Sequence, residues 1–259
     1  MAVRKLDLLS RRDETTTEGA AVELPINIYV NSKLAATLFA TPTSQSELAI
    51  GYLVGEGILR AYSGIQTVSC SEETTTVHVR TKPGTRVRIR AARVVRVLTS
   101  ACGSSEDFHR LLDRIEKPLV RADQQVSASE VTRMMRVFNE HSEKFREIGG
   151  FQYAAAFFEG QMNAFFEDVG MDNAVAKALG GVMKAGLDSS RTVLVISGRL
   201  SGAEVIKAAR VGVPIILSMR EPTYSGVRLA QKTGVTLCCS VRGPRMNIYS
   251  GFDRIIVDP

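Results

Sequence analysis

Short apolar runs alternate with helix-like segments in the last third of the chain, and this alternation limits the possible folds more than any other feature. The helix-like segments are residues 202–211 and 224–232, and a short apolar stretch at 247–249 comes last. The apolar runs are VLVIS (193–197), PIILS (214–218) and VTLCCS (235–240). Strand and helix in regular alternation is the pattern of a parallel sheet with right-handed crossovers. The region is therefore predicted to be α/β.

Each of the three apolar runs ends in the same tripeptide, Ser-x-Arg. The tripeptides are Ser197-Gly198-Arg199, Ser218-Met219-Arg220 and Ser240-Val241-Arg242. If the strands are parallel, all three lie at the carboxyl edge of one sheet, which is where open α/β sheets bind ligands. Serine offers a hydroxyl donor and arginine a planar fork that suits phosphate. One interpretation is a pocket for a phosphorylated, nucleotide-like ligand, with helix N-termini adding to anion binding. The alternative is chance or helix capping.

Known phosphate-binding fingerprints are missing from the chain. Neither G-x-x-x-x-G-K-[ST] nor G-x-G-x-x-G occurs. ATP hydrolysis and Rossmann-type NAD binding are therefore disfavoured.

The first hundred residues have a β-rich pattern, so we expect a β-rich N-terminal region at 1–100 and an α/β region at 101–259. A helix is expected to begin at Ser44 or Ser46. The expected strands are residues 22–30, 33–40, 74–80 and 86–90. In the last of these, Arg86, Arg88 and Arg90 would share one face. That face is either a solvated outer surface or a basic wall near the cysteine that follows.

The middle of the chain contains three further expected elements. Residues 127–145 have the pattern of an amphipathic helix, in which Ser127 and Glu130 fit a capping box. A hairpin is expected at 152–166, turning at Glu159-Gly160, and a helix near 171–186.

Composition restricts the compartment and the partners. The cysteines are Cys70, Cys102, Cys238 and Cys239, and the adjacent pair cannot easily form a disulfide framework, so a reducing cytoplasm is expected. No signal peptide and no membrane span are predicted. The net charge of +6 permits an anionic partner. Nucleic acid is disfavoured because the chain has no Trp and few aromatic residues near its arginines.

Cys102, in the stretch LTSACGSSEDF (98–108), is the candidate nucleophile. A helix beginning at Ser104 or Ser105 would favour the thiolate, whereas Glu106 and Asp107 oppose it, so the sequence leaves its ionisation open. His109 is roughly 10 Å away along a helix, too far for a local Cys–His dyad. A cysteine that carries sulfur needs only to accept a sulfane sulfur as a persulfide and pass it on.

Metal chemistry has little support in the sequence. His141-Ser142-Glu143 matches half of the zinc-deaminase signature, but the P-C-x-x-C half is absent. We therefore expect no protein-ligated metal. Another possible function is that of a nucleobase-processing hydrolase, which would need bound zinc.

Motifs spread along nearly the whole chain resemble the FdhD/NarQ family of formate dehydrogenase accessory sulfurtransferases. The matches are Glu23-Leu24-Pro25, Asn31, Thr41-Pro42, Leu48, Gly51, Glu56-Gly57, Thr99 to Glu106, Gly149-Gly150, Glu167 to Gly170, Asn173-Ala174, Lys177, Ser197 to Ser201, Pro222-Thr223 and Arg242 to Tyr249. Together these are far more specific than any single motif.

The resemblance implies a sulfur carrier. It would take sulfur as a persulfide from a cysteine desulfurase and pass it to a molybdenum or tungsten cofactor with two pterin guanine dinucleotides. Formate dehydrogenase or a related molybdoenzyme would be the client. The resemblance also implies a cytidine-deaminase-like α/β/α fold and a homodimer. Cys102 would be the sulfur carrier, and the terminal run Ser240 to Arg245 would bind the cofactor.

Combining the resemblance with the strand-end tripeptides defines the expected site. The expected cofactor-binding residues are Ser197, Gly198, Arg199, Ser218, Ser240, Val241, Arg242, Gly243, Pro244, Arg245 and Asn247.

The chain departs from the family pattern at several positions. Ser105 replaces the second cysteine, so a persulfide on Cys102 cannot be resolved internally as a disulfide. Gln152 stands where the family has a histidine, Met171-Asp172 where it has Arg-His, and Ala176 where it usually has Asp. The alternative to a sulfur carrier is a nucleotide- or pterin-cofactor-binding chaperone that has lost sulfur transfer.

Overall fold

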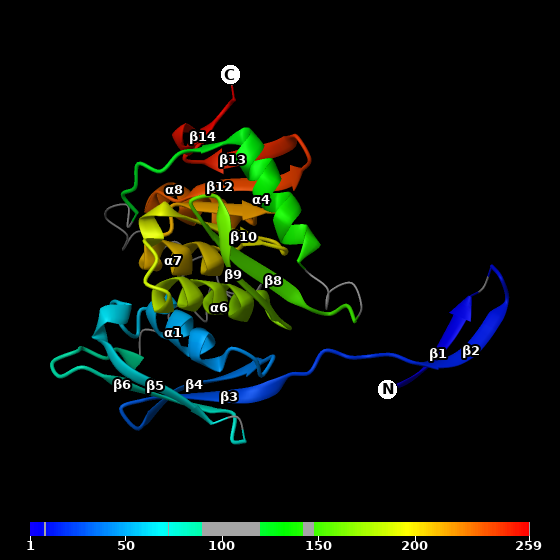
Figure 1. Cartoon of the computed structure of the whole chain (residues 1–259), viewed down its shortest axis with the longest axis horizontal. Helices are drawn as coiled ribbons and strands as arrows, with labels where there is room; N and C mark the ends of the chain where they lie inside the picture. Colours follow the sequence, from blue (N-terminus) through cyan, green and yellow to red (C-terminus); the bar gives the residue numbers. More distant parts are fainter. Residues whose placement is uncertain (8, 72, 90–119, 142–147, 259) are drawn as a thin grey trace.

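Two β-sheets with helices between them form the body of the protein (Figure 1). The computed structural model describes residues 1–259 except residues 8, 72, 90–119, 142–147 and 259. Cys102, Ser105 and the expected boundary near residue 100 lie outside the described residues, so the division into two regions stays a prediction. No helix in the described part of the chain is long and apolar enough to cross a membrane.

The larger sheet has six strands in the order β13-β12-β11-β10-β8-β9. Its strands are β8 (Gln152–Phe158), β9 (Gln161–Asp168), β10 (Thr192–Ile196), β11 (Ile215–Ser218), β12 (Thr236–Arg242) and β13 (Arg245–Ser250). β10, β11 and β12 are parallel, which confirms the pattern seen in the sequence. β8 and β13 run antiparallel to their neighbours, so the sheet as a whole is mixed.

Helices cover both faces of this sheet, giving three α/β/α layers (Figure 1). One apolar core joins it to α6 (Met171–Lys184), α7 (Gly202–Val211) and α8 (Tyr224–Thr233). The other core joins it to α4 (Ala128–Glu140). Ser127 and Glu130 form the expected capping box on α4, which ends at Glu140. Residues 142–145 of the expected helix lie outside the described residues.

The smaller sheet has the order β4-β3-β6-β5 and packs against α1. Its elements are β3 (Leu24–Val30), β4 (Lys33–Ala40), α1 (Gln45–Gly55), β5 (Ile65–Ser71) and β6 (Thr76–Thr81). α1 packs in turn against α6 of the larger layer. At Gly51 an added Cβ would lie 1.7 Å from the backbone oxygen of Ala176, so only glycine permits this close helix contact.

The strand expected at 86–90 is wrong for its described residues. Residues 85–88 belong to no strand, although the Arg88 N–H donates to the Ile58 carbonyl at 2.9 Å. Val87 and Ile89 pack against the core beneath the small sheet, whereas Arg86 and Arg88 are exposed. The alternation therefore reflects an extended segment lying on a core without a partner strand. The basic wall expected from Arg86, Arg88 and Arg90 stays a prediction, because Arg90 lies outside the described residues.

Smaller elements complete the described structure. Strands β1 (Ala2–Asp7) and β2 (Arg12–Thr17) form a hairpin that was not expected from the sequence and that projects from the body in Figure 1. β7 (Val126–Ser127) pairs with β14 (Ile255–Ile256). The short 3-10 helices are η1 (Tyr62–Gly64), η3 (Ser189–Arg191) and η4 (Phe252–Arg254).

A buried ion pair ties the end of β4 to α6. Lys177 Nζ lies 2.6 Å from Asp168 Oδ2, and both side chains are completely buried. Lys177 donates to the Thr41 carbonyl at 2.9 Å, and the Thr41 N–H donates to Asp168 at 3.1 Å. Asn173 Nδ2 donates to both Asp168 and the Phe39 carbonyl. These motif residues therefore hold the two layers together.

Candidate functional site

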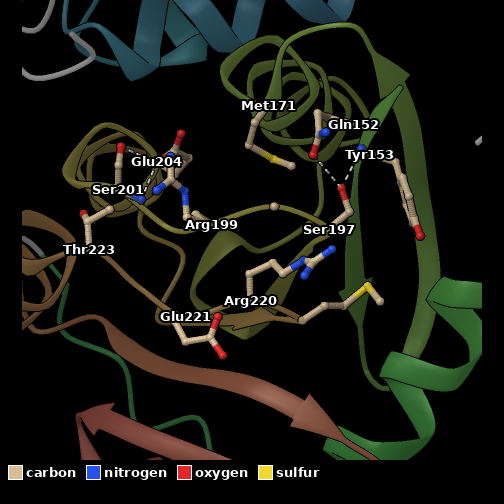
Figure 2. A pocket seen from close by; sticks show the side chains of 12 residues that line it. Gln152, Tyr153, Met171, Ser197, Arg199, Ser201, Glu204, Arg220, Glu221 and Thr223 are labelled. Atoms are coloured by element: carbon tan, nitrogen blue, oxygen red, sulfur yellow. Dashed lines mark hydrogen bonds between the residues drawn. The ribbon is translucent and has the colours of Figure 1, made fainter. Parts of the chain in front are cut away.

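Two adjoining cavities lie at the carboxyl edge of the parallel strands, as the strand-end tripeptides predict. The first has a volume of about 650 Å³ and the second of about 570 Å³. Figure 2 shows the residues that line the first cavity: Gln152, Tyr153, Met171, Ser197, Gly198, Arg199, Ser201, Glu204, Met219, Arg220, Glu221 and Thr223. The second is lined by Glu221, Ser240, Arg242, Pro244, Arg245, Met246 and Asn247. Glu221 borders both.

Four exposed arginines make these cavities cationic. Arg199 and Arg220 line the first cavity, while Arg242 and Arg245 line the second. In Figure 2, Arg199 lies on the side of Glu204, and Arg220 extends toward Ser197. Neither of these two guanidinium groups forms an ion pair with any residue that the structure describes. Guanidinium forks left open in this way suit a phosphorylated ligand.

The three strand-end serines have different roles. Ser197 Oγ accepts from the Tyr153 N–H at 3.1 Å and donates to Gln152 Oε1 at 3.2 Å, at the wall of the first cavity. Ser240, in the left-handed backbone region with φ of 54°, donates to Glu221 at 3.2 Å.

Ser218, expected among the binding residues, is completely buried and lines neither cavity. Its hydroxyl donates to the Gly198 carbonyl at 2.7 Å and accepts from the Arg220 N–H at 3.0 Å. It therefore holds the loops that carry Gly198 and Arg220. Val241 is also buried, in the core shared with α4, on the opposite side of the sheet from Cys239 because the strand is irregular between Cys239 and Arg242.

The two helix N-termini beside the first cavity differ in their charge. Ser201 caps α7 with Glu204 as the second member of a capping box. Burial and then the negative charge of Asp172 raise the pKa of the Glu204 carboxyl. α7 thus carries its own carboxyl group where an anion would bind. Thr223 caps α8, which has no acidic residue in its first turn, so α8 is the better anion site.

Two of the departures from the family pattern lie at the first cavity. Gln152 and Met171 line it and pack closely at Gly198, where an added Cβ would lie 2.8 Å from Met171 Cε and 3.0 Å from Gln152 Oε1. Asp172, next in sequence, forms an ion pair with buried Lys207, which also lies 2.9 Å from Glu56. Burial alone would lower the pKa of Lys207, but the charges of Asp172 and Glu56 raise it above its ordinary value.

The described cysteines differ in their accessibility. Cys238 and Cys239 are completely buried in β12. Burial raises the pKa of Cys238 to about 12 and raises that of Cys239 as well, so neither is a thiolate at neutral pH. Cys70 is exposed on β5.

Most expected binding residues are brought together, but several lining residues were missed. Ser197, Gly198 and Arg199 line the first cavity, and Ser240, Arg242, Pro244, Arg245 and Asn247 the second. Gly243, between Arg242 and Pro244 in the sequence, is exposed in a turn and lines neither cavity. The missed lining residues include Gln152, Met171, Glu204 and Glu221. Arg220 stood in a strand-end tripeptide, and Glu221 directly follows it. In the sequence, Gln152 and Met171 stood out only because they differ from the residues that the family has at these positions.

Comparison with known proteins identifies relatives along almost the whole chain. The model of the FdhD/NarQ family matches residues 21–256. Three relatives are each named sulfur carrier protein FdhD. That of Listeria innocua is 32% identical over 92% of this chain and 91% of the relative. That of Anaeromyxobacter sp. is 34% identical over 95% and 91% of the two chains. That of Sulfolobus acidocaldarius is 30% identical over 98% and 99%.

A solved structure has the same fold. The crystal structure of a protein described as a formate dehydrogenase accessory protein, from Desulfotalea psychrophila, superposes with a TM-score of 0.79. It covers 99% of this chain and 98% of the other, at 22% sequence identity. The likeness establishes the α/β architecture and leaves the cytidine-deaminase-like topology a prediction.

Proposed function

The chain belongs to the FdhD/NarQ family, and on that premise we propose that it is a sulfur carrier acting on a phosphorylated pterin cofactor. The single observation that carries the cofactor part is the pair of adjoining cavities with four arginines at the carboxyl edge of the sheet. Its relatives named sulfur carrier proteins support the sulfur part.

Cys102 is the proposed carrier, because it is the cysteine at the position of the family's sulfur-carrying motif, and Cys238 and Cys239 are buried. Its thiolate attacks the terminal sulfur of a persulfide on a cysteine desulfurase. The donor's S–S bond breaks, a new S–S bond forms on Cys102, and the desulfurase cysteine leaves as a thiolate. The transfer involves no net oxidation. Ser105 does not prevent this step, because one thiolate suffices for it.

The proposed acceptor is a molybdenum or tungsten cofactor carrying pterin guanine dinucleotides, bound as cargo. Arg199 and Arg220 in one cavity, and Arg242 and Arg245 in the other, would hold its phosphates. Delivery reduces the carried sulfur to sulfide with two electrons from the acceptor's metal centre, and Cys102 returns as a thiolate. A formate dehydrogenase or related molybdoenzyme is the proposed client, and the active carrier is proposed to be a homodimer.

The proposal is tested by loading the protein with sulfur. The full chain is incubated with a cysteine desulfurase and cysteine, without added thiol reductant, and its intact mass is measured. A gain of one sulfur atom per chain that disappears on later reduction is expected. An unchanged mass, beside a desulfurase that has formed its own persulfide, would contradict the proposal.

The phosphate role of the arginines gives a second prediction. Arg199→Ala and Arg242→Ala are each expected to weaken GDP binding by about 10-fold or more, because hydrogen bonds to charged groups contribute ~1.5–3 kcal/mol. Calorimetric titration of the folded variants measures the change. Arg228→Ala, an exposed arginine on α8 that lines neither cavity, is the matched control and should leave the affinity unchanged. Equal losses in all three variants would indicate a general effect of charge.

A further inference from the structure

A carboxylate interrupts the cationic rim between the two strand-end cavities. Glu221 lines both cavities, with Arg220 lining the first and Arg242 the second. Its side chain is 61% exposed. Ser240 Oγ donates to Oε1 at 3.2 Å, and Arg242 Nη2 lies 3.8 Å from the same oxygen. Both of these side-chain contacts are made through Oε1, so the carboxylate is oriented and Oε2 has no side-chain partner among the residues that the structure describes.

The ionisation of Glu221 restricts what it can bind. A hydrogen bond from its own backbone, then one from Ser240, and the charges of Arg242 and Arg220 lower the pKa of its carboxyl group. At neutral pH the group is therefore a pure hydrogen-bond acceptor. It repels phosphate, which the neighbouring arginines attract. A ligand that satisfies both must carry phosphate at one end and N–H donors at the other.

The chemistry of nucleotide bases narrows the class of donor. A carboxylate accepts best from two adjacent N–H groups that point the same way. Guanine offers this arrangement in N1–H and its amino group, and a pterin ring has the same edge. Adenine offers an amino group beside an N1 acceptor, which repels a carboxylate. Hypoxanthine keeps N1–H but lacks the amino group.

We propose that Glu221 determines specificity by recognising the paired N–H edge shared by guanine and pterin rings. This inference rests on the proposed function, which assigns the strand-end cavities to a guanine-nucleotide-containing cofactor. It adds Glu221 as the residue that selects the ring. The arginines on either side of Glu221 would then bind only the phosphates.

The inference is tested by comparing GDP with IDP, which differs only in lacking the amino group. Their Kd values are measured by calorimetry on the full-length protein and on Glu221→Gln and Glu221→Ala. The unmodified protein is expected to prefer GDP by about 10- to 100-fold, as for a hydrogen bond to a charged acceptor. In Glu221→Ala the preference should fall to within about threefold. Loss of the charge affects the phosphates of both nucleotides equally, so the ratio isolates recognition of the ring.

Glu159→Gln is the matched control. Glu159 is likewise an exposed carboxylate paired with an arginine, Arg191 at 2.8 Å, and it lines neither cavity. This variant should keep the full preference for GDP. An unchanged preference in Glu221→Gln and Glu221→Ala would overturn the inference while leaving the proposed function standing.

Two further outcomes show whether Glu221 recognises a guanine ring or a pterin ring, and whether the cavities bind such a ligand at all. If neopterin monophosphate binds in a Glu221-dependent manner and GDP shows no such dependence, Glu221 recognises the pterin ring. If the unmodified protein binds neither probe, the ligand assignment fails and this inference fails with it. Sulfur loading, measured separately, would then still report on the carrier role.

Discussion

Replacing Cys102 with alanine is expected to abolish the gain of one sulfur atom that the unmodified chain shows with a cysteine desulfurase. The reaction requires a thiolate that a partner protein can reach. Cys238 and Cys239 do not meet this requirement, because both are buried in β12 and burial raises their pKa values. Intact mass spectrometry before and after reduction measures the loss. Activation of a client formate dehydrogenase should disappear in parallel.

Cys70 provides the control for this experiment. It is exposed, so simple accessibility would allow it to take up sulfur as well. Cys70→Ala should nevertheless load as the unmodified chain does. Persistent loading of Cys102→Ala, or its loss in Cys70→Ala, would place the carried sulfur elsewhere. Client activation by a Cys102→Ala protein that no longer loads would instead favour a cofactor-binding chaperone.

Replacing Lys177 with methionine is expected to destabilise the protein by about 3–5 kcal/mol, the usual result of removing one partner of a buried ion pair. The substitution leaves the completely buried Asp168 carboxyl group without its cationic partner. It also removes the donor to the Thr41 carbonyl. Urea unfolding followed by circular dichroism measures the change, which should appear as a lower midpoint.

Lys184 is a matched control on the same helix. Its ammonium group pairs with Glu47 at 2.7 Å, but its side chain is 48% exposed. Lys184→Met should therefore change the stability by no more than about 1 kcal/mol, as for surface ion pairs in general. If both lysine variants lost the same stability, the buried network would have no special role in joining α6 to the end of β4.

Local pattern predicted the elements whose signal lies within a few neighbouring residues. The apolar runs before Ser197, Ser218 and Ser240 became three parallel strands. The capping pair Ser127 and Glu130 formed as expected. The segment at 86–88 shows the limit of such signals, because alternation indicates one buried face and leaves open whether a partner strand exists.

The sequence by itself determined the family and the edge of the sheet at which the binding residues meet. Parallel strands place their carboxyl ends together, so three similar strand ends are enough to locate a site. Only the tertiary structure decided that Gln152 and Met171 share a cavity with Arg199, that Ser218 is buried, and that Glu221 lies between two cavities. Contacts between residues far apart in the chain depend on how the layers pack, and the periodicity of a short stretch of sequence does not predict that packing.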